Sequence, residues 1–295
     1  VAGSLAGAGT LGLLIPPSIA LICYGIITGN SVGQLYMAGF IPGFMLSLMF
    51  MAFISAFALV RPGITPTIAE SYTWKQKLQG TVKILPTLVL IFLVLGLIYL
   101  GVSTPTEAAM IGVTGALLAT FLYRTFSFKV LKEALFSAIR TTCMLLFIMM
   151  MAGILSSVVG YLRIPSGLAS AAVEAGLSPT SLFILVCIIY LILGCFFDGL
   201  SMMLLTLPIV YPLLVTEIGF NPIWFGVILT ILIEVAQLTP PVGFNLYVIQ
   251  QISGLPITTV AKWSLPFSIV LVLGVVLLYL FPQIALFLPA TMIHH

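Results

Sequence analysis

The segment LIPPS (residues 14–18) returns as LTPPV (residues 238–242), an offset of 224 because 240 minus 16 is 224. Each copy carries a Pro-Pro pair within an apolar run. Proline has no amide hydrogen and clashes with the preceding turn, so a helix must unwind at each pair. The same offset brings Pro42 onto Pro266, and each of these prolines opens a long apolar run. The sequence therefore predicts an internal repeat built around two broken helices.

The amino-acid composition indicates whether these breaks lie in water or in a membrane. Of 295 residues, 61% are hydrophobic and 6% are charged, against roughly 45–50% and 25% in soluble domains. The first 60 residues contain no Asp, Glu, Lys or Arg. Long apolar runs cross membranes as helices, whereas barrel strands are short and alternate in polarity. We therefore expect an all-α polytopic membrane protein in a lipid bilayer, with no nucleic-acid partner.

The basic residues determine the predicted topology. Eight of the ten lie in two clusters, which the positive-inside rule places in the cytoplasm: Arg61, Lys75, Lys77 and Lys83, then Arg124, Lys129, Lys132 and Arg140. The two apolar runs between the clusters form an out-and-back pair. Counting spans from the clusters, the first copy of the repeat ends outside and the second ends inside. The sequence therefore predicts inverted repeats.

Two short apolar runs between residues 181 and 216 meet at FDGLS (residues 197–201). A charged residue at the centre of such a region is costly unless it is paired or lies in a wet cavity. We therefore expect a re-entrant helical hairpin that enters and leaves from outside, with its tip near the membrane midplane. The alternative is two ordinary spans joined by a surface turn at Asp198-Gly199.

The predicted organisation has seven parts. They are a broken helix completing the first inverted repeat (1–30), a transmembrane helix (31–60), a cytoplasmic amphipathic loop (61–83), transmembrane helices of the second repeat (84–161), a connector with the re-entrant hairpin (162–217), a broken transmembrane helix (218–256) and a C-terminal transmembrane helix (257–295).

Inverted repeats with matched broken helices point to a secondary transporter with a site at the midplane. Unwound backbone exposes carbonyl oxygens, which are hard ligands suited to a cation such as Na⁺. Uncharged groups of this kind surround both breaks: Gly9, Thr10 and Gly12 at the first, Gln237 and Thr239 at the second. We expect Na⁺ as the coupling ion and no other metal or cofactor.

No basic residue lies in a predicted midplane segment, so an anionic substrate would need helix N-termini. The N-termini that follow Pro17, Gly199 and Pro241 are the candidates. The predicted substrate-binding residues are Pro17, Ser18, Pro241, Gly243 and Asn245.

Three stretches are similar to the signature motifs of one family: GTLGLLIPPS (9–18), TPTEAA (104–109) and LTPPVG (238–243). They resemble the DctM- and SiaM-like large membrane subunit of tripartite ATP-independent periplasmic (TRAP) transporters, without its N-terminal part. The resemblance implies an elevator-type, ion-transporter-superfamily-like fold and a Na⁺-driven importer in the bacterial inner membrane. It also implies two partners, a small four-helix membrane subunit and a periplasmic substrate-binding protein that delivers sialic acid, a C4-dicarboxylate or a related organic acid.

The resemblance also assigns ion sites. One would lie between the hairpin tip, with Asp198, Gly199 and Ser201, and the break from Gln237 to Thr239. The other would use Gly9, Thr10 and Gly12 with a tip in the absent N-terminal part. Ser103 and Thr104 are further candidates, for which a turn-forming role is the alternative.

Two intramembrane carboxylates have alternative roles. Glu234 precedes the second break by about one turn, so it either tunes the ion site or pairs with a neighbouring segment. Glu107 follows Pro105 at a predicted helix start, where we expect it to cap the helix.

Other functions lack support in the sequence. There is no Walker-type phosphate loop, and both histidines lie at the extreme C-terminus. The four cysteines have no metal-ligand spacing, and the carboxylates lie in separate motifs. We therefore expect no enzyme activity. The alternative function is an ion channel with re-entrant filter loops.

Overall fold

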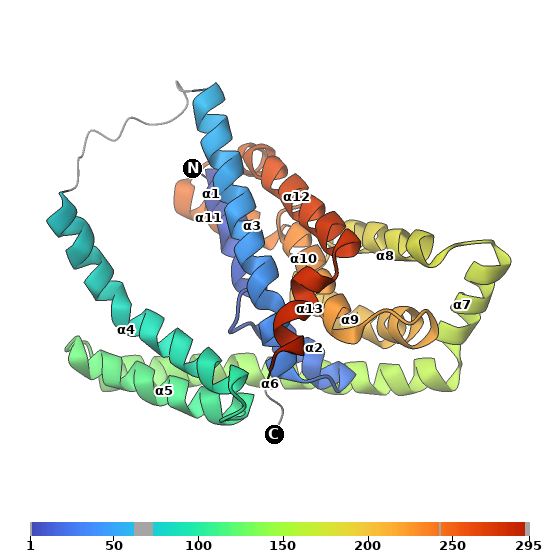
Figure 1. Ribbon diagram of the computed structural model, residues 1–295, viewed down its shortest axis with the longest axis horizontal. Coiled ribbons are helices and arrows are strands. Elements are labelled where there is room, and N and C mark those ends of the chain that lie inside the picture. The colour runs from blue at the N-terminus through green and yellow to red at the C-terminus, as the bar shows by residue number, and fades with distance from the viewer. Residues whose placement is uncertain (1, 62–72, 242, 293–295) are drawn as a thin grey trace. The chain divides into compact units, whose positions relative to one another are not determined.

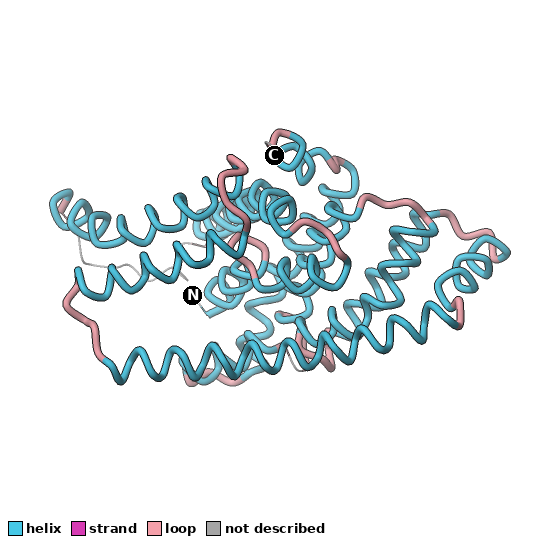
Figure 2. The backbone as a smooth tube through the Cα atoms, turned by 90° about the horizontal axis from the view of Figure 1, so that it is seen from below, coloured by secondary structure: helices cyan, strands magenta, loops and turns pink. Residues whose placement is uncertain are grey.

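The computed structural model describes residues 2–61, 73–241 and 243–292, and these residues form helices and loops without a strand (Figures 1 and 2). The all-α prediction is confirmed for them. Five of the described helices are long and apolar enough to cross a membrane: Val32–Val60, Pro105–Leu122, Phe128–Tyr161, Gly199–Glu217 and Ile257–Leu280. The chain is therefore a multi-pass membrane protein.

The chain divides into two compact units, Val1–Ala52 with Leu145–Thr291, and Phe53–Met144 with the last residues. The first unit contains both Pro-Pro breaks. Its helices are α1 (Ala2–Thr10), η1 (Leu11–Leu13), α2 (Ile19–Thr28), most of α3 (Val32–Val60), the second part of α6 (Phe128–Tyr161), α7 (Ile164–Glu174), α8 (Pro179–Leu193), α9 (Gly199–Tyr211), η3 (Pro212–Glu217), α10 (Pro222–Gln237), α11 (Phe244–Ser253), α12 (Ile257–Leu280) and α13 (Gln283–Ala290).

The two copies of the repeat have the same local structure. A helix unwinds before each Pro-Pro pair and a ten-residue helix follows, α2 in the first copy and α11 in the second. Each short helix ends at a glycine with positive φ, Gly29 at 70° and Gly254 at 68°, a conformation that favours glycine. The next helix in each copy, α3 or α12, contains the matched Pro42 or Pro266. The two predicted helix breaks are confirmed, and their opposite orientation in a membrane stays a prediction.

The segment from α8 to η3 contains the predicted hairpin. Ser178 caps α8 and Asp198 caps α9, and a hydrogen bond between the Tyr190 and Thr206 hydroxyls joins the two arms. The first arm has 15 residues, or about 22 Å at 1.5 Å per residue, which is shorter than a hydrocarbon core of about 30 Å. The second arm continues through η3 and is long enough to span. The prediction of two short arms was therefore wrong for the second arm, and re-entrance stays a prediction.

The second unit contains a helical hairpin of α4 (Trp74–Tyr99) and α5 (Pro105–Leu122). The two helices pack antiparallel, because a Cβ at Gly112 would lie 3.6 Å from Val94 and one at Gly115 would meet Leu90. Gly101, with a φ of 70°, lies in the turn between them.

Helix boundaries differ from the predicted ones in three places. Of the predicted loop 61–83, residues 62–72 lie outside the described residues and 74–83 begin α4. The second basic cluster, predicted to lie between spans, belongs to a helix from Phe128 onward, and its long side chains can reach the membrane interface from there. The C-terminal helix, predicted as one element over 257–295, ends at Leu280 and a second helix begins at Gln283, since Pro282 donates no hydrogen bond.

Candidate functional site

The hairpin tip packs against the end of α10, next to the second break. A Cβ atom at Gly194 would collide with Ala236, and one at Gly199 would collide with Ile233 and lie 3.5 Å from Nε2 of Gln237. Only glycine permits this approach at either position. The structure thus brings together Gly199 and Gln237, two of the residues predicted for one cation site.

Asp198 and Ser201 begin α9 at this tip. The Asp198 carboxylate accepts hydrogen bonds from the backbone N–H groups of Leu200, at 3.3 Å, and Ser201, at 3.1 Å. This is an N-cap, in which a carboxylate satisfies free amide donors and complements the helix dipole. The carboxylate is exposed and Ser201 is half-buried. A carboxylate oxygen has lone pairs beyond those used in capping, so Asp198 stays a predicted ligand.

Threonine hydroxyls lie next to both breaks. The Thr239 hydroxyl donates to the Val235 carbonyl at 2.7 Å, and the Thr10 hydroxyl donates to the Gly7 carbonyl at 2.8 Å. Such bonds to the preceding turn are common in helices. They use the hydroxyl hydrogen and leave the oxygen lone pairs available to a cation. Thr239 is half-buried, whereas Thr10 is fully buried.

The helix N-termini after the breaks differ in how they are capped. The Ser18 hydroxyl accepts from the Leu21 N–H at 3.2 Å and donates to the Leu13 carbonyl, so it caps α2. Among the described residues, no side chain caps α11, whose N-cap is Gly243 at φ 38°. Since Asp198 also occupies the N-terminus of α9, α11 is the one of the three predicted anion-binding N-termini without a side-chain cap.

Asn245 in the first turn of α11 lies beside the first copy of the repeat, because a Cβ at Gly9 would be 3.6 Å from Asn245 Nδ2. The structure thus places a predicted substrate residue next to a predicted ion residue. The other predicted positions show no such pairing. Nothing lies within 4 Å of a Cβ at Gly12; Pro17 and Pro241 are exposed, and the Pro241 carbonyl accepts from the Tyr247 hydroxyl at 3.4 Å.

In the second unit, Thr104 and Glu107 cap α5 reciprocally. The Glu107 carboxylate accepts from the Thr104 N–H at 2.8 Å, and the Thr104 hydroxyl accepts from the Glu107 N–H at 3.3 Å. This capping box confirms the expected role of Glu107 and supports the turn-forming alternative for Thr104. The Ser103 hydroxyl is buried and has no hydrogen-bond partner in the described part of the chain, and its role as a ligand stays a prediction.

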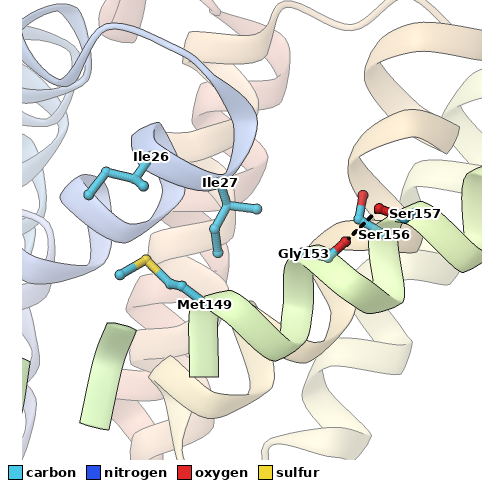
Figure 3. A pocket seen from close by; sticks show the side chains of 6 residues that line it. All are labelled: Ile26, Ile27, Met149, Gly153, Ser156 and Ser157. Atoms are coloured by element: carbon cyan, nitrogen blue, oxygen red, sulfur yellow. Dashed lines mark hydrogen bonds between the residues drawn. The ribbon is translucent and has the colours of Figure 1, made fainter. Parts of the chain in front are cut away.

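A cavity of about 360 Å³ lies between α2 and α6 within the first unit (Figure 3). Two serines, Ser156 and Ser157, line it, and Ser157 donates to the Gly153 carbonyl at 3.0 Å. None of the predicted site residues lines it. Its lining residues are Ile26, Ile27, Met149, Gly153, Ser156 and Ser157. This cavity is therefore separate from the predicted ion and substrate positions.

Three residues of the tip contact were missed in the sequence. Gly194, Ile233 and Ala236 form it with Gly199. A signal for Gly194 exists, since it precedes the tip motif as a small residue in an apolar run. Ile233 and Ala236 carry no such signal, because their role arises only from packing against a distant segment.

The chain is similar in sequence to known proteins. The family model of the DctM component of tripartite ATP-independent periplasmic transporters matches residues 1–284. The C4-dicarboxylate TRAP transporter large permease protein DctM of Pseudomonas aeruginosa is 36% identical over 98% of this chain and 67% of its own length. The sialic acid TRAP transporter large permease protein SiaM of Vibrio cholerae is 30% identical, over 98% and 67%. The ectoine TRAP transporter large permease protein TeaC of Halomonas elongata is 32% identical, over 94% and 64%. These matches show that the chain belongs to the DctM family of tripartite ATP-independent periplasmic transporters.

Proposed function

We propose that this chain is the large membrane subunit of a Na⁺-coupled importer of organic acids in the bacterial inner membrane. Family membership supports a transporter rather than an enzyme. The observation that carries the proposal is the contact of the hairpin tip with the end of α10 beside the second break. In that arrangement, tip and break offer oxygens to one cation, and moving them together across the membrane would constitute an elevator mechanism.

The N-terminus of α11, which has no side-chain cap among the described residues, supports an anionic substrate. Free backbone N–H groups at the positive end of a helix bind carboxylates. Two relatives are named for C4-dicarboxylate and sialic acid, which are organic acids. We infer that the carboxylate binds at Gly243 to Asn245, with Pro241 in the same break. Pro17 and Ser18 would occupy the corresponding position in the first copy.

Two partners belong to the proposal. A periplasmic substrate-binding protein would deliver the acid, and a small four-helix membrane subunit would complete the transporter. Na⁺ would be cargo and coupling ion, bound at Asp198, Gly199, Ser201, Gln237 and Thr239 in one site and at Gly9, Thr10 and Gly12 in the other.

We expect uptake into proteoliposomes to require an inward Na⁺ gradient and both partners. The uptake rate should saturate as the substrate concentration rises. The physical reason is that the uncharged oxygens at the breaks suit a hard monovalent cation. Candidate acids are first screened for binding to the periplasmic partner. Uptake of the labelled acids that bind then measures the dependence on Na⁺. Equal uptake with a proton gradient in Na⁺-free buffer would refute Na⁺ coupling, and uncoupled, non-saturating Na⁺ flux would favour the channel.

We expect a cysteine introduced at Gly80 to react with a membrane-impermeant thiol reagent only from the cytoplasmic side. Gly80 is exposed in the basic N-terminal part of α4, and a Cβ there meets no described atom within 4 Å. The positive-inside rule places this part in the cytoplasm. The new cysteine is introduced into a Cys143→Ser variant, because the exposed Cys143 could itself react with the reagent. Labelling from the periplasm would reverse the whole topology.

A further inference from the structure

Glu234 is a carboxyl group that neither capping nor the proposed ion site uses. It lies on α10 one turn before the second break and is 0% exposed. Neither carboxyl oxygen has a hydrogen-bond partner among the residues that the structure describes. A buried, unpartnered carboxyl is uncommon and requires an explanation.

Glu234 belongs to the helix that ends at the second break, and its carboxyl group lies beside the first break. The backbone of Leu14, directly before the first Pro-Pro pair, lies beside its carboxyl group. The Leu14 N–H donates to the Leu11 carbonyl at 3.1 Å, so its approach to Glu234 does not reach hydrogen-bond geometry. The carboxyl group therefore lies where the two copies of the repeat meet.

The register of α10 and α12 places a second unpartnered group at the same level. Trp224 Nε1 donates to the Leu278 carbonyl at 2.8 Å, which joins the start of α10 to the end of α12. Because the two helices pack along each other, they run antiparallel. Glu234 lies ten residues after Trp224 in α10, and Ser268 lies ten residues before Leu278 in α12. Each is therefore about 15 Å along its helix from the hydrogen-bonded pair. The Ser268 hydroxyl is also buried and finds no hydrogen-bond partner among the described residues.

The groups around α10 do not neutralise this carboxyl. Tyr24, Tyr190 and Tyr279 contact other groups: Tyr24 donates to the Pro222 carbonyl, Tyr190 bonds Thr206 and Tyr279 bonds Thr180. Lys262 on α12 is exposed, and Asp198 caps α9. Neither η1 nor α13 has a titratable side chain. The remaining titratable groups on the elements packed against α10 are Cys23, Cys187, Tyr211 and Tyr247.

An ionised carboxylate in such a place is strongly unfavourable, so the group takes up a cation. A Na⁺ ion needs several oxygens and room for itself, whereas the packing leaves neither oxygen in contact with solvent. A proton needs no added space. We propose that Glu234 is a proton-binding site between the two broken helices, and that uptake depends on this proton.

Infrared spectroscopy tests the proton directly and does not depend on the proposed transport function. The purified complete transporter is compared with its Glu234→Gln variant at neutral pH. The difference spectrum should show the carbonyl stretch of a protonated carboxylic acid, and the Glu174→Gln control, which removes an exposed carboxyl of α7, should retain it. Carboxylate bands in place of the acid band would overturn the proposal.

A second test measures how uptake depends on pH, and this test rests on the proposed transport function. With a fixed Na⁺ gradient, uptake by the natural chain and by Glu174→Gln should fall at alkaline pH, by up to about tenfold per pH unit once the proton leaves. Glu234→Gln should show no such fall and should keep its Na⁺ half-saturation. An unaltered pH profile in Glu234→Gln would overturn the proposal, as would a tenfold weaker half-saturation, which would make Glu234 a Na⁺ ligand.

A second variant covers the case in which glutamine does not fold. The repeat offset places Glu234 on Thr10, since 234 minus 10 is 224, and the first copy holds a fully buried threonine there. Glu234→Thr should therefore be accommodated and should also lose the acid band and the pH dependence. If no Na⁺-driven uptake occurs at all, the proposed function fails while the infrared result still decides on Glu234.

Discussion

Replacing Gly199 with valine should abolish Na⁺-driven uptake without preventing membrane insertion. A Cβ at this position would collide with Cγ2 of Ile233, so the hairpin tip would have to move away from α10. Overpacking of this kind costs about 1–3 kcal/mol per substitution, which is roughly 5- to 140-fold in the population of the packed tip. The branched side chain should add to this cost. Uptake in proteoliposomes and the Na⁺ half-saturation measure the effect.

The matched control is Gly167→Val. Gly167 is an exposed helical glycine in α7, and a Cβ there meets nothing within 4 Å, so uptake should stay unchanged. A rescue pair makes the test specific. Gly199→Ala alone should impair uptake, and combining it with Ile233→Ala should restore it, because the colliding methyl is then absent. Full activity of Gly199→Val, or no rescue by Ile233→Ala, would contradict the proposed tip contact.

The breaks of the fold could be predicted because their cause is local. A Pro-Pro pair removes two donors wherever it occurs, so the unwinding before Pro16 and Pro240 follows from the sequence. Prolines inside α9 and at the start of η3 did not have the same effect. Pro208 lies within α9, and the chain continues through Pro212 as a π-helical turn. Whether a single proline ends a helix depends on packing, which one sequence does not reveal.

The candidate site was predictable only in part, for a related reason. The motif residues at the tip and the break could be named from the pattern, and the structure brings Gly199 to Gln237. The partners that hold them there, Ile233 and Ala236, are ordinary apolar residues of α10. The environment of Glu234 was also hidden, because its neighbour Leu14 is more than two hundred positions away. Two roles were predicted for Glu234, tuning the ion site or pairing with a neighbouring segment, and both stay predictions; the structure adds that the Leu14 backbone lies beside its carboxyl group.

Thr239→Val and Ser201→Ala should each weaken Na⁺ binding at one shared site. The Thr239 hydroxyl donates to Val235 and keeps its lone pairs, while Ser201 begins α9 at the tip that packs beside Gln237. Valine nearly conserves the shape of threonine but offers no oxygen. Loss of a ligand to a charged group costs roughly 1.5–3 kcal/mol, or about 10- to 140-fold in Na⁺ affinity.

The double variant separates a shared site from two independent effects. If both oxygens bind the same ion, the loss in the double variant should be smaller than the sum of the single losses, because residues that share a ligand are coupled. Thr114→Val is the matched control, since the Thr114 hydroxyl makes the same bond to the preceding turn, to Met110 at 2.9 Å, on α5. Its Na⁺ half-saturation should not change. Variants of Thr239 and Ser201 that insert normally and keep the natural half-saturation would show that the cation does not bind between the tip and the break. Asp198-Gly199 would then be only the N-terminal cap and close contact that the structure shows.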